Sequence, residues 1–200
     1  MVLFLHGFGD QCPEEQVAVQ ELRREVELLG GQLKVPTYHP GGDVAATRPA
    51  TFLQDLDLSE ESFAVVGFSF GGLLAATLQE MRPDKITKCV LIAPAIDNFE
   101  RNFAAKRKED WHLAEEYVAE LQKLPARPSI KVPTMLIHGL SETDADGSAV
   151  WRVREWVDKE PFGPTYFPEG GHSLDIVGRG CPGWQELAHW LCGREADTRA

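Results

Sequence analysis

The sequence has little cysteine, with four residues (Cys12, Cys89, Cys181 and Cys192) among 200. They are too few and too scattered for a disulfide scaffold, and none forms a C-x-x-C pair suited to zinc binding or redox exchange. We therefore expect reduced thiols. His39 and Asp43 flank the turn Pro40-Gly41-Gly42, but two ligands are a weak basis for a zinc site. We expect neither a metal nor an organic cofactor.

Long apolar runs and dense basic clusters are missing too. The first apolar run, residues 2–5, is too short for a signal peptide, and no later run approaches the length of a bilayer span. The net charge is −11, and the densest basic cluster, residues 106–108, has acidic neighbours. These features argue against a membrane span and against nucleic acid as a partner. A cytoplasmic location is the expected default, and the oligomeric state is left open.

The composition and the pattern of apolar residues predict one α/β domain over residues 1–200. Hydrophobic residues make up 43% and charged residues 26%, as in ordinary globular proteins. Short apolar runs alternate with helical patterns around residues 17–29, 72–81 and 184–191, which is typical of parallel βα units. The central runs are continuously apolar, so helices should cover both faces of the sheet. The expected strands are residues 2–6, 33–37, 63–68, 89–92, 134–138 and 165–167.

The stretch from about 97 to 131 is the one long connection in this pattern. Charged residues alternate there with aromatic and apolar ones, and Pro125 and Pro128 follow. Long insertions between regular elements often carry function. We interpret this stretch as a small helical cap over the sheet.

The strongest chemical signal is Gly67-Phe68-Ser69-Phe70-Gly71-Gly72, which follows an apolar strand and opens onto a helix-forming run. A nucleophile at a strand-to-helix turn needs a strained backbone and tiny neighbours two positions before and after it. Ser69 is therefore the candidate nucleophile of a nucleophile elbow. The alternative is that Ser69 only caps the helix.

Two backbone N–H groups are candidates for an oxyanion hole. The N–H of Phe70 lies at the start of the helix, where the dipole favours negative charge. The N–H of Phe8 follows His6-Gly7 at the end of the first strand. His6 itself is assigned to support of that loop.

His172 is the candidate base, because it lies in a glycine-rich loop, Gly170-Gly171-His172, just after the last strand. Such a loop at the carboxyl edge of the sheet can reach Ser69 and accept its proton. His39, His112 and His189 lack that context, and His138 closes a strand. A triad also needs a buried carboxylate to orient the imidazole, and Glu142, Asp144 and Asp146 all remain open for that role.

These motifs resemble the α/β-hydrolase superfamily, and within it small intracellular esterases and thioesterases that begin with an M-x-L-x-L-H-G-F strand. The resemblance extends from Leu3 to Trp190. It implies a three-layer α/β-hydrolase fold with a minimal, mostly parallel sheet of about six strands, since the usual first two strands are absent. In that family the strand before the acid usually ends in H-G-x-x-D, which places Glu142 at the acid position, with glutamate instead of aspartate.

The resemblance implies a serine hydrolase acting through a catalytic triad on a small-molecule ester or thioester. Aromatic residues near the elbow and in the cap favour an apolar pocket for small to medium acyl groups, although each could instead pack in the core. The same fold also supports acyl transfer, lyase or peptidase chemistry, and some relatives only bind ligands or proteins. The pocket candidates are Phe8, Phe70, Phe99, Phe103 and Trp111.

Overall fold

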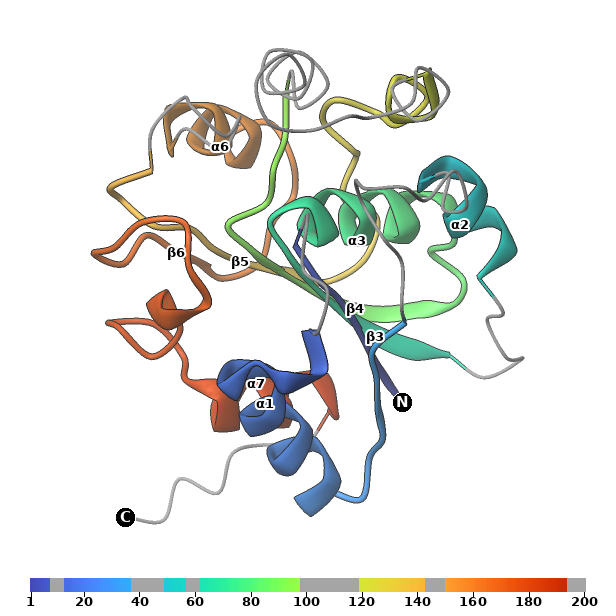
Figure 1. Ribbon diagram of the computed structural model, residues 1–200. Helices are drawn as coiled ribbons and strands as arrows, with labels where there is room; N and C mark the ends of the chain where they lie inside the picture. The colour runs from blue at the N-terminus through green and yellow to red at the C-terminus, as the bar shows by residue number, and fades with distance from the viewer. Residues whose placement is uncertain (8–12, 37–48, 57–61, 98–118, 143–149, 194–200) are drawn as a thin grey trace.

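A single six-stranded parallel sheet forms the centre of the computed structural model, which describes residues 1–7, 13–36, 49–56, 62–97, 119–142 and 150–193. The order in the sheet is β2-β1-β3-β4-β5-β6, and every neighbouring pair is parallel (Figure 1). The strands are β1 (Val2–Leu5), β2 (Leu33–Lys34), β3 (Phe63–Phe68), β4 (Ile86–Ile92), β5 (Thr134–Ile137) and β6 (Thr165–Tyr166).

All six predicted strands are confirmed, with changes at their ends. Strand β4 begins three residues earlier than expected, whereas β2 and β6 keep only two residues each. The register pairs Leu5 with Gly67, Gly67 with Leu91, and Ile92 with Ile137. The strands therefore end at one common edge, which brings the loops after β1, β3, β4 and β5 together.

Helices cover both faces of the sheet and make the predicted three layers (Figure 1). One face is covered by α1 (Val17–Leu28) and α7 (Trp184–Leu191), and the other by α2 (Pro49–Asp55), α3 (Phe70–Met81) and α6 (Val150–Val157). Two short 3₁₀ helices, η1 (Pro13–Glu15) and η3 (Leu174–Ile176), lie in the connections. The α/β three-layer prediction is confirmed, while α2 and α6 were not predicted.

Side chains of the central strands alternate between the two hydrophobic layers. Val65 and Leu91 pack toward α3, and Val66 and Val90 pack toward α1 and α7. All four are fully buried, which explains why these strands are apolar at every position rather than at every second one. Burial of each such side chain contributes roughly 1.5–3 kcal/mol. The result is a firm platform beneath the loops at the carboxyl edge.

The helix α1 buries one face, as the helical pattern around residues 17–29 predicts. Val19, Leu22 and Val26 are buried, whereas Val17 is 70% exposed. Val17 is the first residue of the helix, so its side chain projects past the layer that α1 shares with α7. The helix itself was correctly predicted.

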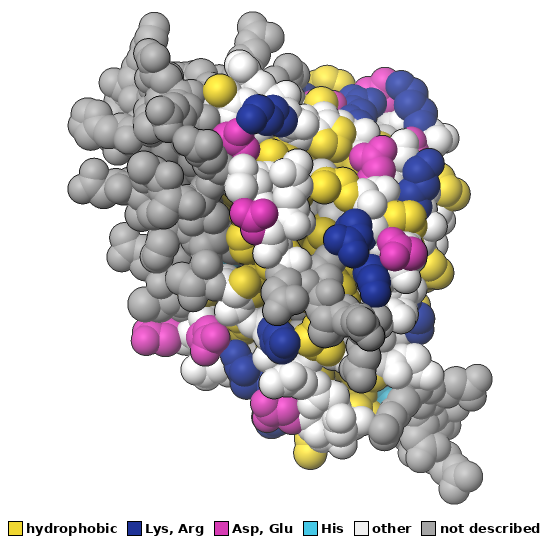
Figure 2. All heavy atoms as spheres, turned by 90° about the vertical axis from the view of Figure 1, so that its right-hand side faces the viewer, with side chains coloured by type: hydrophobic (Ala, Val, Ile, Leu, Met, Phe, Trp, Pro, Cys, Tyr) yellow, Lys and Arg dark blue, Asp and Glu magenta, His cyan; other side chains and the backbone are white. Residues whose placement is uncertain are grey.

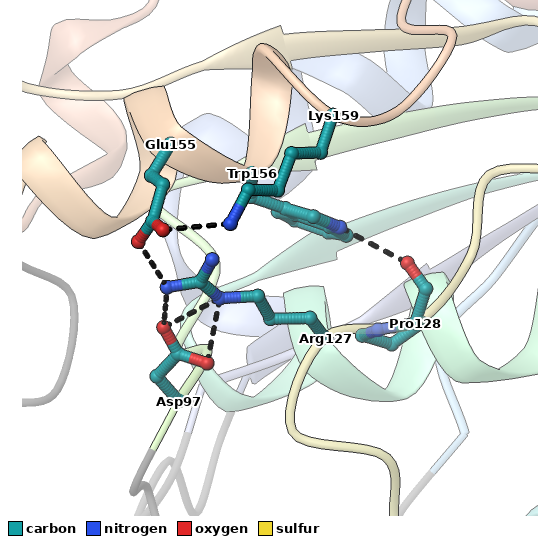
Figure 3. A network of polar contacts seen from close by, with 6 residues as sticks. All are labelled: Asp97, Arg127, Pro128, Glu155, Trp156 and Lys159. Carbon is teal, nitrogen blue, oxygen red and sulfur yellow. Dashed lines mark hydrogen bonds and ion pairs between the residues drawn. The ribbon is translucent and has the colours of Figure 1, made fainter.

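A polar network joins the two ends of the stretch 97–131 (Figure 3). The Asp97 N–H donates to the carbonyl of Ala126 at 2.9 Å, and the Arg127 Nε donates to both Asp97 carboxylate oxygens at 2.8 and 2.6 Å. Arg127 also bonds Glu155 of α6 at 2.8 Å. Both ends of the stretch are thus joined to each other and to α6. Most of the predicted cap, residues 98–118, lies outside the described residues.

The described surface mixes both signs of charge. On the face shown in Figure 2, Lys and Arg side chains are interspersed with Asp and Glu among hydrophobic groups. Within the described ranges, no helix is both long enough and apolar enough to span a bilayer. The same ranges hold no group of three or more His, Cys, Asp or Glu side chains arranged to bind a metal ion.

Candidate active site

Ser69 occupies the turn between β3 and α3 in an unusual backbone conformation, with φ 56° and ψ −119°. Such a conformation is strained for a residue with a side chain and persists only where its surroundings hold it. The Ser69 N–H donates to the carbonyl of Ile92 at 3.0 Å. The Ser69 carbonyl accepts from the N–H groups of Gly72 and Ala95, both at 2.9 Å. The end of β4 therefore holds the turn in place.

Glycine is required on both sides of this turn by direct packing of backbone on backbone. A Cβ on Gly67 would lie 2.2 Å from the carbonyl oxygen of Gly71, and one on Gly71 would lie 2.0 Å from that of Leu5. Neither neighbour is the flexible end of a side chain. The strand β1, the turn and α3 thus approach one another more closely than any side chain would permit.

The Ser69 hydroxyl is directed at His172. Its Oγ lies 2.7 Å from His172 Nε2, although the two residues are 103 positions apart. Ser69 does stand at the N-cap position of α3, but its side chain makes no capping hydrogen bond. The geometry therefore differs from the alternative in which Ser69 only caps the helix.

Glu142 contacts the other nitrogen of the same imidazole. Its Oε2 lies 3.1 Å from His172 Nδ1, and the Glu142 side chain is only 1% exposed, compared with 25% for His172. With Glu142 as the acceptor, His172 carries its proton on Nδ1 and presents Nε2 to Ser69 as an acceptor. The structure thus brings Ser69, His172 and Glu142 together. The alternatives Asp144 and Asp146 lie outside the described residues.

The loops that carry Glu142 and His172 are joined through their main chains. The Leu140 N–H donates to the carbonyl of Pro168 at 2.9 Å, and the Ser141 N–H donates to that of Gly170 at 2.8 Å. A Cβ on Gly139 would lie 2.5 Å from the Gly170 oxygen. The loop after β5 and the loop after β6 therefore lie in direct contact, which fixes the separation of the carboxylate and the imidazole.

A second imidazole lies against the same carboxylate. His138 follows β5 and is fully buried, and its Nε2 lies 3.6 Å from Glu142 Oε2. In the sequence alone, His138 is recognisable only as the end of a strand. Its spacing of four residues before Glu142 is the signal that could have linked the two.

Comparisons with known proteins agree with this architecture. Residues 50–142 match the family model described as alpha/beta hydrolase fold. Est1E from Butyrivibrio proteoclasticus, solved with bound ferulic acid, superposes with a TM-score of 0.68 at 14% identity, over 96% of this chain and 89% of that one. The chain has the α/β-hydrolase fold. A search of curated proteins found no significant match.

Two other solved structures with the α/β-hydrolase fold show the same likeness. Mouse alpha/beta hydrolase domain-containing protein 10 superposes with a TM-score of 0.65 at 16% identity, over 88% of this chain and 84% of that one. The thioesterase domain from the curacin biosynthetic pathway gives a TM-score of 0.57 at 18% identity, over 95% and 90% respectively. Distant structural neighbours of this chain thus include esterases and thioesterases.

In an α/β-hydrolase fold, oxyanion donors come from the residue after the nucleophile and from the loop after the strand that corresponds here to β1. Phe70 is the first residue of α3, so its N–H lies at the positive end of that helix. Phe8 lies outside the described residues, which reach Gly7. His6 is 1% exposed, and its Nδ1 donates to the carbonyl of Gly7 at 2.9 Å.

One of the predicted pocket residues is buried in the core. The Phe70 ring is 1% exposed and packs in the core between the sheet and α3, so it does not line an open pocket, and that part of the prediction is corrected. The first residue of α3 turns its side chain toward the sheet. Instead, the Phe68 ring lies beside His172, with ring centroids 5.2 Å apart. Phe99, Phe103 and Trp111 lie outside the described residues.

Proposed function

We propose that this protein is a serine hydrolase that cleaves carboxylic esters or thioesters through an acyl-enzyme intermediate. The observation that carries the proposal is the connected series Ser69 Oγ, His172 and Glu142, with separations of 2.7 and 3.1 Å. The hydroxyl stands on a strained, glycine-flanked turn, and the carboxylate is buried. Each feature is what activation of a serine requires.

In this mechanism His172 Nε2 accepts the proton of Ser69 as Oγ attacks the substrate carbonyl carbon. The tetrahedral intermediate collapses by breaking the bond to the leaving oxygen or sulfur, and His172 returns the proton to that leaving group. A water molecule, deprotonated by His172, then attacks the acyl carbon. The bond from that carbon to Ser69 Oγ breaks, His172 returns the proton to Oγ, and the carboxylic acid leaves. Glu142 holds the imidazole in the required tautomer and stabilises its protonated form.

The negative charge of the tetrahedral oxygen would be stabilised by the N–H groups of Phe70 and Phe8. A donor placed where charge develops only in the transition state contributes roughly 3–4 kcal/mol. The N–H of Phe70 has the additional advantage of its place at the start of α3. No metal or organic cofactor is needed for these steps.

The preferred substrates in this proposal carry small to medium apolar acyl groups. The aromatic residues Phe99, Phe103 and Trp111 of the proposed cap, with Phe8, would supply an apolar surface. Two neighbours at low identity are in accord with this choice: one esterase was solved with ferulic acid, and another neighbour is a thioesterase domain. The cap, residues 97–131, would be an insertion in a single domain of residues 1–200.

The test is covalent labelling with a fluorophosphonate probe, followed by mass spectrometry of the labelled peptide. We expect the wild-type protein to be labelled at Ser69 and the Ser69→Ala variant not to be labelled. A folded wild-type protein that remains unlabelled would instead favour a non-catalytic relative that uses the fold for binding. Labelling that persists in the variant would exclude Ser69 as the nucleophile.

A further inference from the structure

The Glu142 carboxylate has an unusually sparse set of partners for a buried charge. Its side chain is 1% exposed, and its Oε1 is buried without a hydrogen-bond partner among the described residues. Both nearby nitrogens, His172 Nδ1 at 3.1 Å and His138 Nε2 at 3.6 Å, face the other oxygen, Oε2. Burial of a carboxylate is costly unless opposite charge or N–H groups offset the lost hydration. The imidazole of His172 alone does not offset the cost of burying the Glu142 carboxylate.

His138 is held rigidly in its place beside Glu142. Its backbone N–H donates to the carbonyl of Tyr166 in β6 at 2.9 Å, and its side chain is 0% exposed. The ring of Phe167 lies against it edge-on, with centroids 6.5 Å apart. A fully buried imidazole costs hydration that a purely apolar side chain of similar size would not lose. The burial of His138 at this position therefore indicates a role beyond filling space.

We propose that His138 is a positioning residue for the triad, which rests on the serine hydrolase function proposed above. Its Nε2 lies 3.6 Å from Glu142 Oε2 and holds that carboxylate in place as the acceptor for His172 Nδ1–H. The two imidazoles thus flank one oxygen atom, and only one of them, His172, touches the reacting hydroxyl. His138 acts on the reaction through Glu142.

The expected consequence is confined to the chemical step. Without the His138 imidazole, Glu142 loses one of the two nitrogen neighbours that the described residues provide and is free to rotate away from His172. That rotation leaves the His172 tautomer unspecified, which lowers the fraction of molecules able to activate Ser69. Substrate binding does not involve His138, so KM should change little while kcat falls.

The test compares His138→Leu with His138→Gln by two readouts: the rate of fluorophosphonate labelling and the kcat and KM for p-nitrophenyl acetate. We expect the leucine variant to lose roughly 10- to 100-fold in kcat and labelling rate, the size of loss seen when a hydrogen-bond partner of a metal-binding residue is removed. The glutamine side chain places an N–H near the position of Nε2 and should restore most of that loss. A residue needed only to fill space would show no such rescue.

A double-mutant cycle with Glu142→Gln distinguishes an effect of His138 that acts through the Glu142 carboxylate from a general loss of structure. We expect His138→Leu to cause no further loss in the Glu142→Gln background, because residues that act as one unit are not additive. Equal losses in both backgrounds, or wild-type rates in His138→Leu, would overturn the proposal. So would equal impairment of the leucine and glutamine variants.

Folding of each variant is checked by its melting temperature. If His138→Leu does not fold, the comparison of His138→Gln with His138→Asn decides, because the shorter asparagine amide cannot reach Glu142. The His138→Gln variant should then be labelled faster than the His138→Asn variant, and equal labelling rates would overturn the proposal. If the wild-type protein is not labelled at Ser69, the proposed hydrolase function fails, and the role of His138 fails with it. That outcome differs from one in which the wild-type protein is labelled but the His138 variants have equal labelling rates.

Discussion

The carbonyl oxygen of Leu5 lies where a side chain on Gly71 would begin, since a Cβ on that glycine would be only 2.0 Å from it. The atom that blocks the space belongs to the backbone of β1, in the middle of the sheet beside β3. It cannot move without disturbing the strand pairing. The turn that carries Ser69 therefore depends on a backbone-to-backbone contact between Gly71 and Leu5.

Gly71→Ala should destabilise the protein strongly, by about 3 kcal/mol or more, because overpacking against backbone leaves no flexible group to move. Urea unfolding followed by circular dichroism measures the change. Gly171→Ala is the matched control, since a Cβ there meets no atom within 4 Å, and its stability should stay within about 0.5 kcal/mol of wild type. Equal stability of the two variants would contradict the packing of the turn.

Replacement of each candidate carboxylate by its amide should show, from the loss of kcat, which of the three residues orients His172. We expect Glu142→Gln to lower kcat roughly 10³- to 10⁴-fold, because an amide in this position favours the wrong imidazole tautomer. Asp144→Asn and Asp146→Asn should keep rates near wild type. Hydrolysis of p-nitrophenyl acetate by each purified variant provides the measurement, and intact rates in all three would leave the proposed triad without its acid.

A chain-length series of p-nitrophenyl esters tests the proposed substrate class. We expect kcat/KM to be highest for acetate and butyrate and to fall for dodecanoate and palmitate, because the proposed cap, about residues 97–131, would enclose limited space. The Ser69→Ala variant corrects for spontaneous hydrolysis. Best turnover on the long acyl chains would refute the preference.

Stability at low pH should report on the network at the base of the stretch 97–131. Arg127 and, with it, Lys159 lower the pKa of the Glu155 carboxyl from its ordinary 4.5 to about 2. A carboxyl with a lowered pKa in the folded protein stabilises it above pH 4.5, and this stabilisation is lost as the pH falls toward 2.

The melting temperature of Glu155→Gln should thus lie below that of wild type at neutral pH, and the gap should narrow between pH 4.5 and about pH 2. The Glu155 side chain is 44% exposed, so high salt should reduce the gap at neutral pH as well. A gap that stays constant across this pH range would show that Glu155 does not act through its charge.

The sequence predicts the sheet well because its signals are local. Continuous apolar runs such as residues 63–68 and the glycine spacing around Ser69 are constraints that each segment carries by itself. The helix α6 was missed although Val150, Val153 and Val157 have the apolar spacing of a helix. Its eight residues are fewer than the window of about 11–18 residues over which a helical period is distinguished.

The details of the site depend on tertiary structure, which explains why the sequence predicted them less well than the sheet. Whether the Phe70 ring faces solvent or core is decided by the angle at which α3 leaves the turn, and three carboxylates within five positions of one loop cannot be ranked by spacing. The contact between His138 and Glu142 arises only where the chain turns back at Gly139, as shown by the bond from the Glu142 N–H to the Gly139 carbonyl.

The two main-chain hydrogen bonds from Leu140 and Ser141 to the histidine loop have a consequence for how this protein tolerates change. An N–H donor is supplied by every amino acid other than proline, so the spacing of acid and base does not depend on which side chains stand at positions 140 and 141. Substitutions there are interchangeable as far as the triad is concerned, with proline as the exception. Positions 140 and 141 can therefore vary in side chain while the distance between the Glu142 carboxylate and the His172 imidazole stays the same.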